Sequence, residues 1–138
     1  MLTPSYDGTA KLWIVSGHLL RTFTGHTHWV LSAVYSKDDE SVLTASADGT
    51  AKLWNASGYL LQTFIGHTDL VVSAVFSRDG ALVLTASDDK TAKVWNADTG
   101  DCIKTLRADN VQSAVFACGD YGRRFGDYCL DERPQCLW

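Results

Sequence analysis

The sequence predicts an all-β protein assembled from a repeated four-stranded unit. One observation is that the segment Asp48–Trp54 occurs unchanged as Asp7–Trp13 and in a variant form as Asp89–Trp95, which spaces the three tryptophans 41 residues apart. A second is that each period holds four short apolar runs separated by turn residues, a pattern typical of a strand meander. Similarity at one fixed period indicates a repeat architecture.

The period between residues 26 and 65 shows how each strand is predicted. Its first apolar run is apolar on both faces, as a strand buried between two layers would be. Asp48-Gly49 is a strong hairpin signal, because glycine tolerates the positive φ of tight hairpin turns. The four predicted strands are Trp29–Tyr35, Ser41–Ser46, Thr50–Trp54 and Tyr59–Phe64.

Several residue types recur in phase with this period. A Gly-His pair opens each complete unit, and an aspartate lies six residues before a tryptophan: Gly25-His26, Asp48 and Trp54, then Gly66-His67, Asp89 and Trp95. Over about residues 2–117 the pattern resembles the WD-repeat β-propeller family. The signature Trp-Asp pair is replaced by Trp13-Ile14, Trp54-Asn55 and Trp95-Asn96. The resemblance implies a partial β-propeller of about three four-stranded antiparallel blades.

The resemblance also implies how the chain is divided. We expect propeller blades over 1–117, with a partial blade in 1–25, complete blades in 26–65 and 66–107, and the start of a further blade in 108–117. The first blade should supply only its last strands, about Thr9–Phe23. Inner strands are expected near Leu31–Tyr35, Val72–Phe76 and Gln112–Phe116. Residues 118–138 are rich in Gly, Arg and Cys, and either a divergent tail or a degenerate blade fits them.

Composition disfavours several classes of function. A formal net charge of −4 provides no basic footprint for phosphates, so we expect no nucleic acid as partner. No run approaches the roughly 18 apolar residues of a membrane-spanning helix. The four cysteines occupy no repeated position and form no Cys-x-x-Cys pair, which predicts reduced thiols, no metal and no cofactor. We expect an intracellular, cytoplasmic protein, with organelles and the nucleus left open.

Two sets of polar residues could be mistaken for catalytic triads. A histidine, an aspartate and a hydroxyl can activate a nucleophile, but an active site is needed once and these sets occur in each complete unit. The resemblance implies instead a structural network in which Asp holds His, His contacts the hydroxyl, and the hydroxyl accepts the indole N–H. We predict no catalytic residue and this structural network: His26, Thr44, Asp48 and Trp54, and His67, Thr85, Asp89 and Trp95, with Ser46 and Ser87 as alternative hydroxyls.

Positions that differ between repeats mark surfaces that need not pack. His28 and Trp29 stand where the next repeat has Asp69 and Leu70, and these four residues are candidates for partner binding. Tryptophan is enriched at binding hot spots. It is also large enough to be mostly buried in a small fold. The alternative that Trp29 is simply the half-buried start of the inner strand therefore stays open.

We therefore expect a non-catalytic scaffold for protein–protein interaction, acting as one part of a larger assembly. The alternatives are a fragment of a catalytic propeller and a nucleic-acid-binding module. Closed propellers have about 4 to 8 blades, whereas this chain holds about 3.4 periods. The outer blade faces should be completed by a second chain, by other subunits, or by missing blades of a longer polypeptide.

Overall fold

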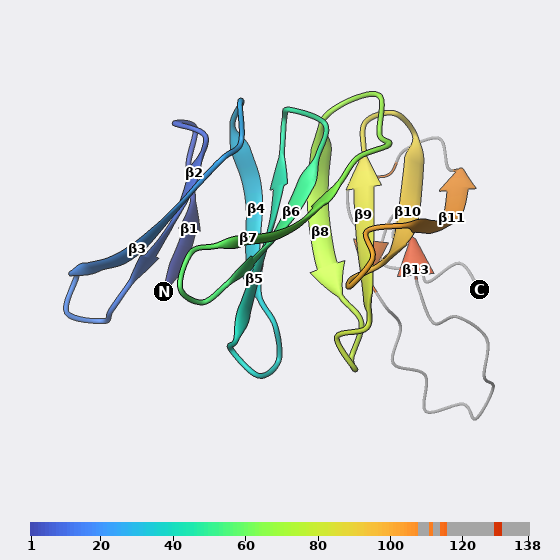
Figure 1. Ribbon diagram of the computed structural model, residues 1–138. Helices are drawn as coiled ribbons and strands as arrows, with labels where there is room; N and C mark the ends of the chain where they lie inside the picture. The colour runs from blue at the N-terminus through green and yellow to red at the C-terminus, as the bar shows by residue number, and fades with distance from the viewer. Residues whose placement is uncertain (108–110, 112–113, 116–128, 131–138) are drawn as a thin grey trace.

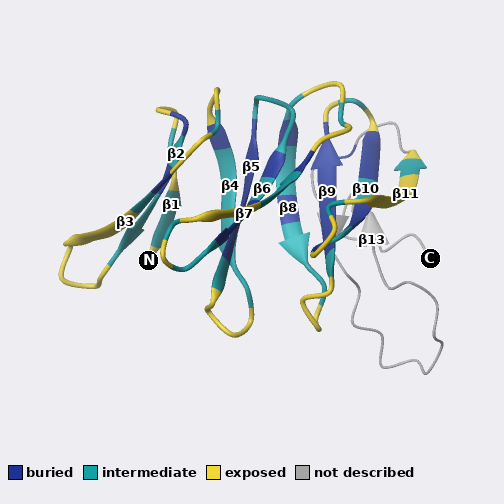
Figure 2. Ribbon diagram, in the orientation of Figure 1, coloured by how far each residue is buried: buried dark blue, intermediate teal, exposed yellow. Residues whose placement is uncertain are grey.

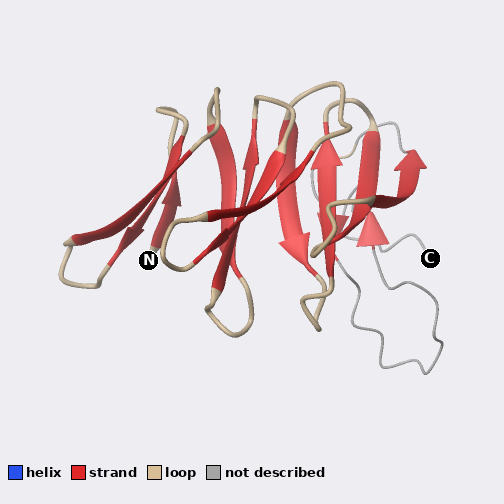
Figure 3. Cartoon of the chain, in the orientation of Figure 1, coloured by secondary structure: helices blue, strands red, loops and turns tan. Residues whose placement is uncertain are grey.

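A computed structural model of the chain describes residues 1–107, 111, 114–115 and 129–130. These residues form strands and turns, with no helix among them (Figure 3). It follows that none of the described residues belongs to a helix long and apolar enough to cross a membrane. The predicted all-β fold, a partial propeller of antiparallel blades, is confirmed.

Two four-stranded antiparallel sheets form the complete blades, and each follows chain order from inner to outer strand. Blade two consists of β4 (Val30–Tyr35), β5 (Ser41–Ser46), β6 (Ala51–Asn55) and β7 (Leu60–Phe64). Blade three consists of β8 (Val71–Phe76), β9 (Leu82–Ser87), β10 (Thr91–Asn96) and β11 (Cys102–Arg107). The strands lie within a residue or two of their predicted positions.

Blade one has three strands: β1 (Leu2–Pro4), β2 (Thr9–Trp13) and β3 (Leu19–Thr24). The sequence predicted only the last two of these. β1 forms because Leu2-Thr3 repeats Leu43-Thr44 of β5, and it pairs with β2 through Leu2–Leu12 and Thr3–Lys11.

A two-stranded sheet follows blade three. β12 (Ala114–Val115) lies where an inner strand was predicted, contacts β8 and β9, and pairs with β13 (Cys129–Leu130). The sequence did not predict β13. The rest of the expected strand Gln112–Phe116, and all of 118–138 except 129–130, lie outside the described residues.

The blades stack side by side along the chain, from β1–β3 at one side to β8–β11 at the other (Figure 1). β1 of blade one contacts β4, and the inner strands β4 and β8 contact each other. Figure 2 shows β5 and β9 buried almost throughout, whereas the outer strands β3 and β11 are largely exposed and β7 is partly exposed. Apolar side chains on both faces of the middle strands therefore hold neighbouring sheets together.

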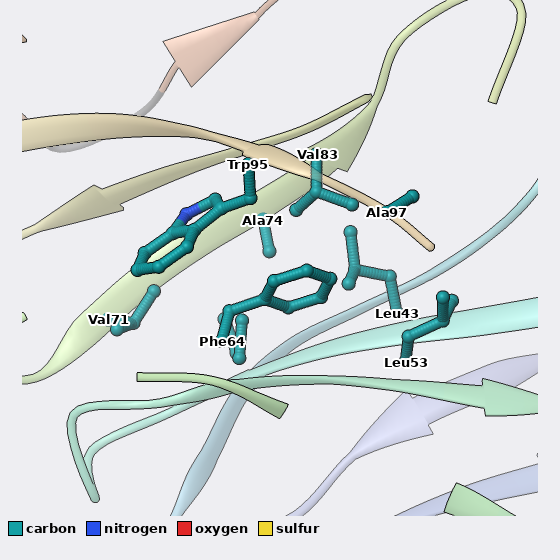
Figure 4. Close-up of a cluster of buried hydrophobic side chains, with 10 residues drawn as sticks. Leu43, Leu53, Phe64, Val71, Ala74, Val83, Trp95 and Ala97 are labelled. Carbon is teal, nitrogen blue, oxygen red and sulfur yellow. The ribbon is translucent and has the colours of Figure 1, made fainter. Parts of the chain in front are cut away.

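The boundary between blades two and three is the largest described core cluster. Phe64 at the end of β7 packs against Trp95 of β10, with ring centroids 5.7 Å apart, among Leu43, Val71, Ala74 and Val83 (Figure 4). Phe23 and Trp54 repeat this contact between blades one and two at 5.9 Å. One packing motif thus serves both boundaries.

The loops that carry the repeated polar residues gather at one edge of the blades, the upper edge in Figure 1. We call this edge the loop rim. It contains the β1–β2, β5–β6 and β9–β10 hairpins together with the β3–β4 and β7–β8 loops.

Candidate functional site

In blade two the four predicted residues form one hydrogen-bonded chain. The Trp54 indole N–H donates to Thr44 Oγ1 at 2.9 Å. Thr44 Oγ1 lies 2.7 Å from His26 Nε2, and His26 Nδ1 lies 2.8 Å from Asp48 Oδ2. We call this arrangement the His–Asp network. It ties β5 and β6 to the β3–β4 loop at the rim.

Blade three repeats the network with nearly the same distances. Trp95 Nε1 donates to Thr85 Oγ1 at 2.8 Å, Thr85 Oγ1 lies 2.7 Å from His67 Nε2, and His67 Nδ1 lies 2.7 Å from Asp89 Oδ2. The structure therefore brings together each set of four residues that the sequence singled out.

The protonation states of the histidines and aspartates determine which atom donates in each hydrogen bond of the network. Burial lowers the pKa of His26 and His67, although the neighbouring aspartates oppose this shift. A neutral imidazole then donates from Nδ1 to the carboxylate and accepts the threonine hydroxyl at Nε2. Burial raises the pKa of the carboxylates, but hydrogen bonds from threonine and histidine outweigh it, so the pKa of Asp48 is lowered and that of Asp89 falls to about 2.

The structure adds members that sequence reasoning missed. Thr50 donates to Asp48 Oδ1 through its backbone N–H at 2.8 Å and its hydroxyl at 2.7 Å, and Thr91 does the same for Asp89 at 2.8 and 2.6 Å. The backbone N–H of Thr27 also donates to Asp48 Oδ2. A signal was available, because a threonine follows two residues after the aspartate in every repeat.

The serines considered as alternative hydroxyls have another role. Ser46 Oγ accepts the N–H of Asp48 and donates to the carbonyl of His28, and Ser87 does the same with Asp89 and Asp69. They shape the hairpin, and no hydrogen bond joins either hydroxyl to the ring of His26 or His67 among the described residues.

The glycine of each Gly-His pair is explained by packing. A Cβ on Gly25 would lie 3.0 Å from Cη2 of Trp54, and one on Gly66 would lie 3.1 Å from Cη2 of Trp95. Because the indole cannot withdraw from a buried position, only glycine lets the loop cross the ring at this distance.

Blade one carries the same aspartate in a different environment. No histidine forms a hydrogen bond or ion pair with Asp7 among the described residues. Its Oδ2 instead accepts Lys11 Nζ at 2.6 Å, and its side chain is 48% exposed, against 8% for Asp48. The Trp13 indole still donates to Thr3 Oγ1 at 2.9 Å. Blade one therefore has the indole–threonine hydrogen bond and the aspartate of the network but lacks the histidine that joins them.

The networks provide little opportunity for catalysis. The His26 and His67 side chains are each 1% exposed, and both ring nitrogens of each are engaged within the network. The hydroxyl of Thr44 is buried and already accepts an indole N–H. In the part of the chain that the structure describes, no three His, Cys, Asp or Glu side chains gather as a metal site would require.

The candidate binding residues lie on the loop rim at the two blade boundaries. His28, Trp29 and Asp69 are exposed, and Leu70 is half-buried. Trp29, at 49% exposure, precedes β4 rather than lying within it. Sequence reasoning missed Tyr6, which contacts the Trp29 ring from blade one at a centroid distance of 5.0 Å.

Stacked four-stranded meanders with a repeated His–Asp network define an arc of β-propeller blades. The family model described as WD domain, G-beta repeat matches residues 17–55 and 58–96, more than half of the sequence. The chain belongs to the WD-repeat family. WD-repeat propellers generally act as non-catalytic scaffolds that bind other proteins.

Among solved structures, the chain is similar to one described as the crystal structure of the WD40 beta propeller domain of Doa1. The match has 34% sequence identity and a TM-score of 0.69. It covers 78% of this chain but 36% of the other, so the chain spans little more than a third of that structure. No curated protein sequence matched the chain.

Proposed function

We propose that this protein is a non-catalytic scaffold that binds partner proteins at the loop rim. The observation that carries the proposal is a contrast between two kinds of position. The His–Asp networks repeat and are buried, whereas the rim positions His28, Trp29, Asp69 and Leu70 differ between the boundaries and are wholly or partly accessible. A surface freed from the packing requirements of the repeat can be specialised for a partner.

We propose a second interface at the ends of the arc. β1 is the edge strand of blade one, and no strand pairs with its inner side among the described residues. The outer strands of the two end blades, β3 and β11, also expose apolar side chains: Leu19, Leu20 and Ile103. Open sheet edges and exposed apolar surface favour association. A second chain, other subunits or further blades of a longer polypeptide would cover them.

Protein partners fit the charge better than nucleic acids do. In the described rim loops the exposed Asp, Glu, Lys and Arg residues are three aspartates and one lysine: Asp7, Asp69, Asp88 and Lys90. An acidic surface repels phosphates. Salt-sensitive retention of the protein on an immobilised polyanion would support the nucleic-acid alternative instead. The cytoplasmic location and the blade boundaries at residues 26, 66 and 108 remain predictions.

The rim proposal can be tested by affinity capture with matched variants. We expect specific proteins to be retained by the wild type and by Tyr59→Ala, an exposed aromatic on the β6–β7 turn, but lost from Trp29→Ala. Thermal melting of Trp29→Ala and Leu70→Ala separates binding from folding. Equal thermal losses in these two variants, with identical captured proteins, would assign Trp29 to the core and contradict the proposal.

A further inference from the structure

Three aromatic rings meet at the boundary of blades one and two. The Trp29 ring forms T-shaped contacts with Tyr6, at a centroid distance of 5.0 Å, and with His28, at 4.9 Å, each at an interplanar angle of 71°. Tyr6 comes from the β1–β2 hairpin, whereas His28 and Trp29 come from the β3–β4 loop. All three residues are exposed, Tyr6 at 75%. Two blades therefore contribute to one aromatic surface.

The next blade boundary shows that packing does not require these rings. In the repeat alignment, Ala47 stands for Tyr6, Asp69 for His28 and Leu70 for Trp29. Both boundaries nevertheless have the same Phe–Trp core contact, and the hairpin beside each has the same hydrogen bond from a threonine N–H to an aspartate Oδ1. The first boundary therefore has aromatic rings at three exposed positions where the second has none. Blade stacking does not explain this difference.

The rings border a pocket of about 260 Å³ lined by residues 6–8 and 26–29. Sites for whole organic ligands begin at roughly 300 Å³, so this pocket suits a single side chain. Its lining is rich in acceptors. Asp7 contributes a carboxylate, and the backbone carbonyls of His26 and His28 approach Gly8.

We infer that Tyr6, His28, Trp29 and Asp7 bind the cationic side chain of a lysine or arginine in an extended segment of a partner protein. Aromatic faces attract cations, and ammonium and guanidinium groups donate to carbonyl and carboxylate oxygens. An anionic side chain would meet the Asp7 carboxylate and the acidic rim. The inference rests on the proposed rim function and specifies what the rim recognises.

Lys11 provides a sharp test, because it already pairs with Asp7. Its Nζ lies 2.6 Å from Asp7 Oδ2 and partly neutralises the carboxylate that faces the pocket. Replacing Lys11 with methionine keeps the aliphatic stem and removes the charge. If Asp7 belongs to a cation site, Lys11→Met should bind a cationic peptide more tightly than the wild type. If Asp7 and Lys11 only support the hairpin, the affinity should not rise.

The experiment uses the full chain labelled with 5-fluorotryptophan, with the Trp29 resonance assigned by its loss in Trp29→Phe. The probes are acetyl-Gly-Ser-X-Ser-Gly-amide peptides in which X is lysine, arginine or the uncharged norleucine. The lysine and arginine peptides should shift the Trp29 resonance, and the norleucine peptide should not. Tyr6→Ala should weaken binding about two- to fivefold, as expected for an exposed cation–π contact. Lys11→Met should tighten it by a similar factor, and Tyr59→Ala, on the β6–β7 turn, should leave it unchanged.

Several outcomes would overturn the inference. Equal shifts with norleucine would indicate an apolar site, and no shift with any peptide would indicate no site. Unchanged or weaker binding by Lys11→Met would contradict the role of Asp7. The cation site and the rim scaffold can fail independently. If the protein captures partners through Trp29 but binds no peptide, only the cation site is refuted. If it binds the peptides but captures no partner through Trp29, only the rim scaffold is refuted.

Discussion

Blades one and two contain the same seven residues, Asp-Gly-Thr-Ala-Lys-Leu-Trp, which form the same hairpin turn and the strand that follows it, β2 in blade one and β6 in blade two. Their side chains nevertheless have different partners. Asp48 is bound by His26 and is nearly buried, whereas Asp7 is bound by Lys11 and is half exposed. Lys52, which corresponds to Lys11, turns away and donates to Thr63 at 3.1 Å. Local sequence therefore determines the strand, but the histidine of a preceding loop determines what the aspartate does.

The largest difference between these blades should come from their tryptophans. Trp54 is 2% exposed, packs on Phe23 and donates to Thr44, whereas Trp13 is only partly buried. We expect Trp54→Ala to lower the free energy of unfolding by about 3–5 kcal/mol, and Trp13→Ala by about half as much because less surface is buried. Urea denaturation of both variants measures this. Equal losses would show that blade one is packed as tightly as blade two.

The aspartates should differ next. Asp48→Ala leaves His26 without its acceptor in the interior, at a cost of about 1–3 kcal/mol. Asp7→Ala removes a solvent-screened surface ion pair and should cost less than Asp48→Ala. His26→Ala should resemble Asp48→Ala, and the double variant should cost less than the sum because both residues belong to one network. Strict additivity in this double-mutant cycle would contradict the network.

The pH dependence follows from the lowered pKa values of the buried histidines. Below about pH 6.5 the unfolded chain takes up protons that folded His26 and His67 resist, so stability should fall as the pH decreases. The pKa of Asp89 is also lowered by folding, so its contribution is lost between about pH 4 and 2. Denaturation at pH 7.5 and 5.5 should show a smaller decrease for His26→Gln than for the wild type. Greater stability of the wild type at pH 5.5 would contradict this account.

The smallest expected effect concerns the hairpin turns. Gly8 and Gly49 have φ values of 83° and 85°, whereas blade three places Lys90 at 66°. A residue with a Cβ is strained in this region. Lys90→Gly should raise stability by up to about 1 kcal/mol, after allowance for the greater freedom of glycine when unfolded. Destabilisation would mean that Lys90 makes a contact that outweighs its strain.

Much of the fold could be predicted because the repeat supplies three copies of one pattern. The strands, and their order within each sheet, follow from the short apolar runs and from the turn residues, such as Asp-Gly, that separate them. β1 was missed because Leu2-Thr3-Pro4 is too short to read as a strand without its partner β2. β13 was missed because nothing in 118–138 repeats an earlier unit.

The candidate site was predictable only where it repeats. The two sets of four residues stand at fixed spacings, so their grouping in space follows from the period. Tyr6 carries no such signal, since its contact with Trp29 joins two blades at positions where the repeats differ. Thr50 and Thr91 could have been found, but their hydrogen bonds to aspartate depend on the shape of the turn.

We expect that this arc of blades, in which β1 is an unpaired edge strand among the described residues, is not a stable monomer in solution. The molar mass of the purified 138-residue protein, measured by light scattering alongside its melting transition, tests this most directly. We predict a dimer in which each chain covers the open edge of the other, or aggregation that a partner protein prevents. A soluble monomer with a sharp melting transition would contradict the account.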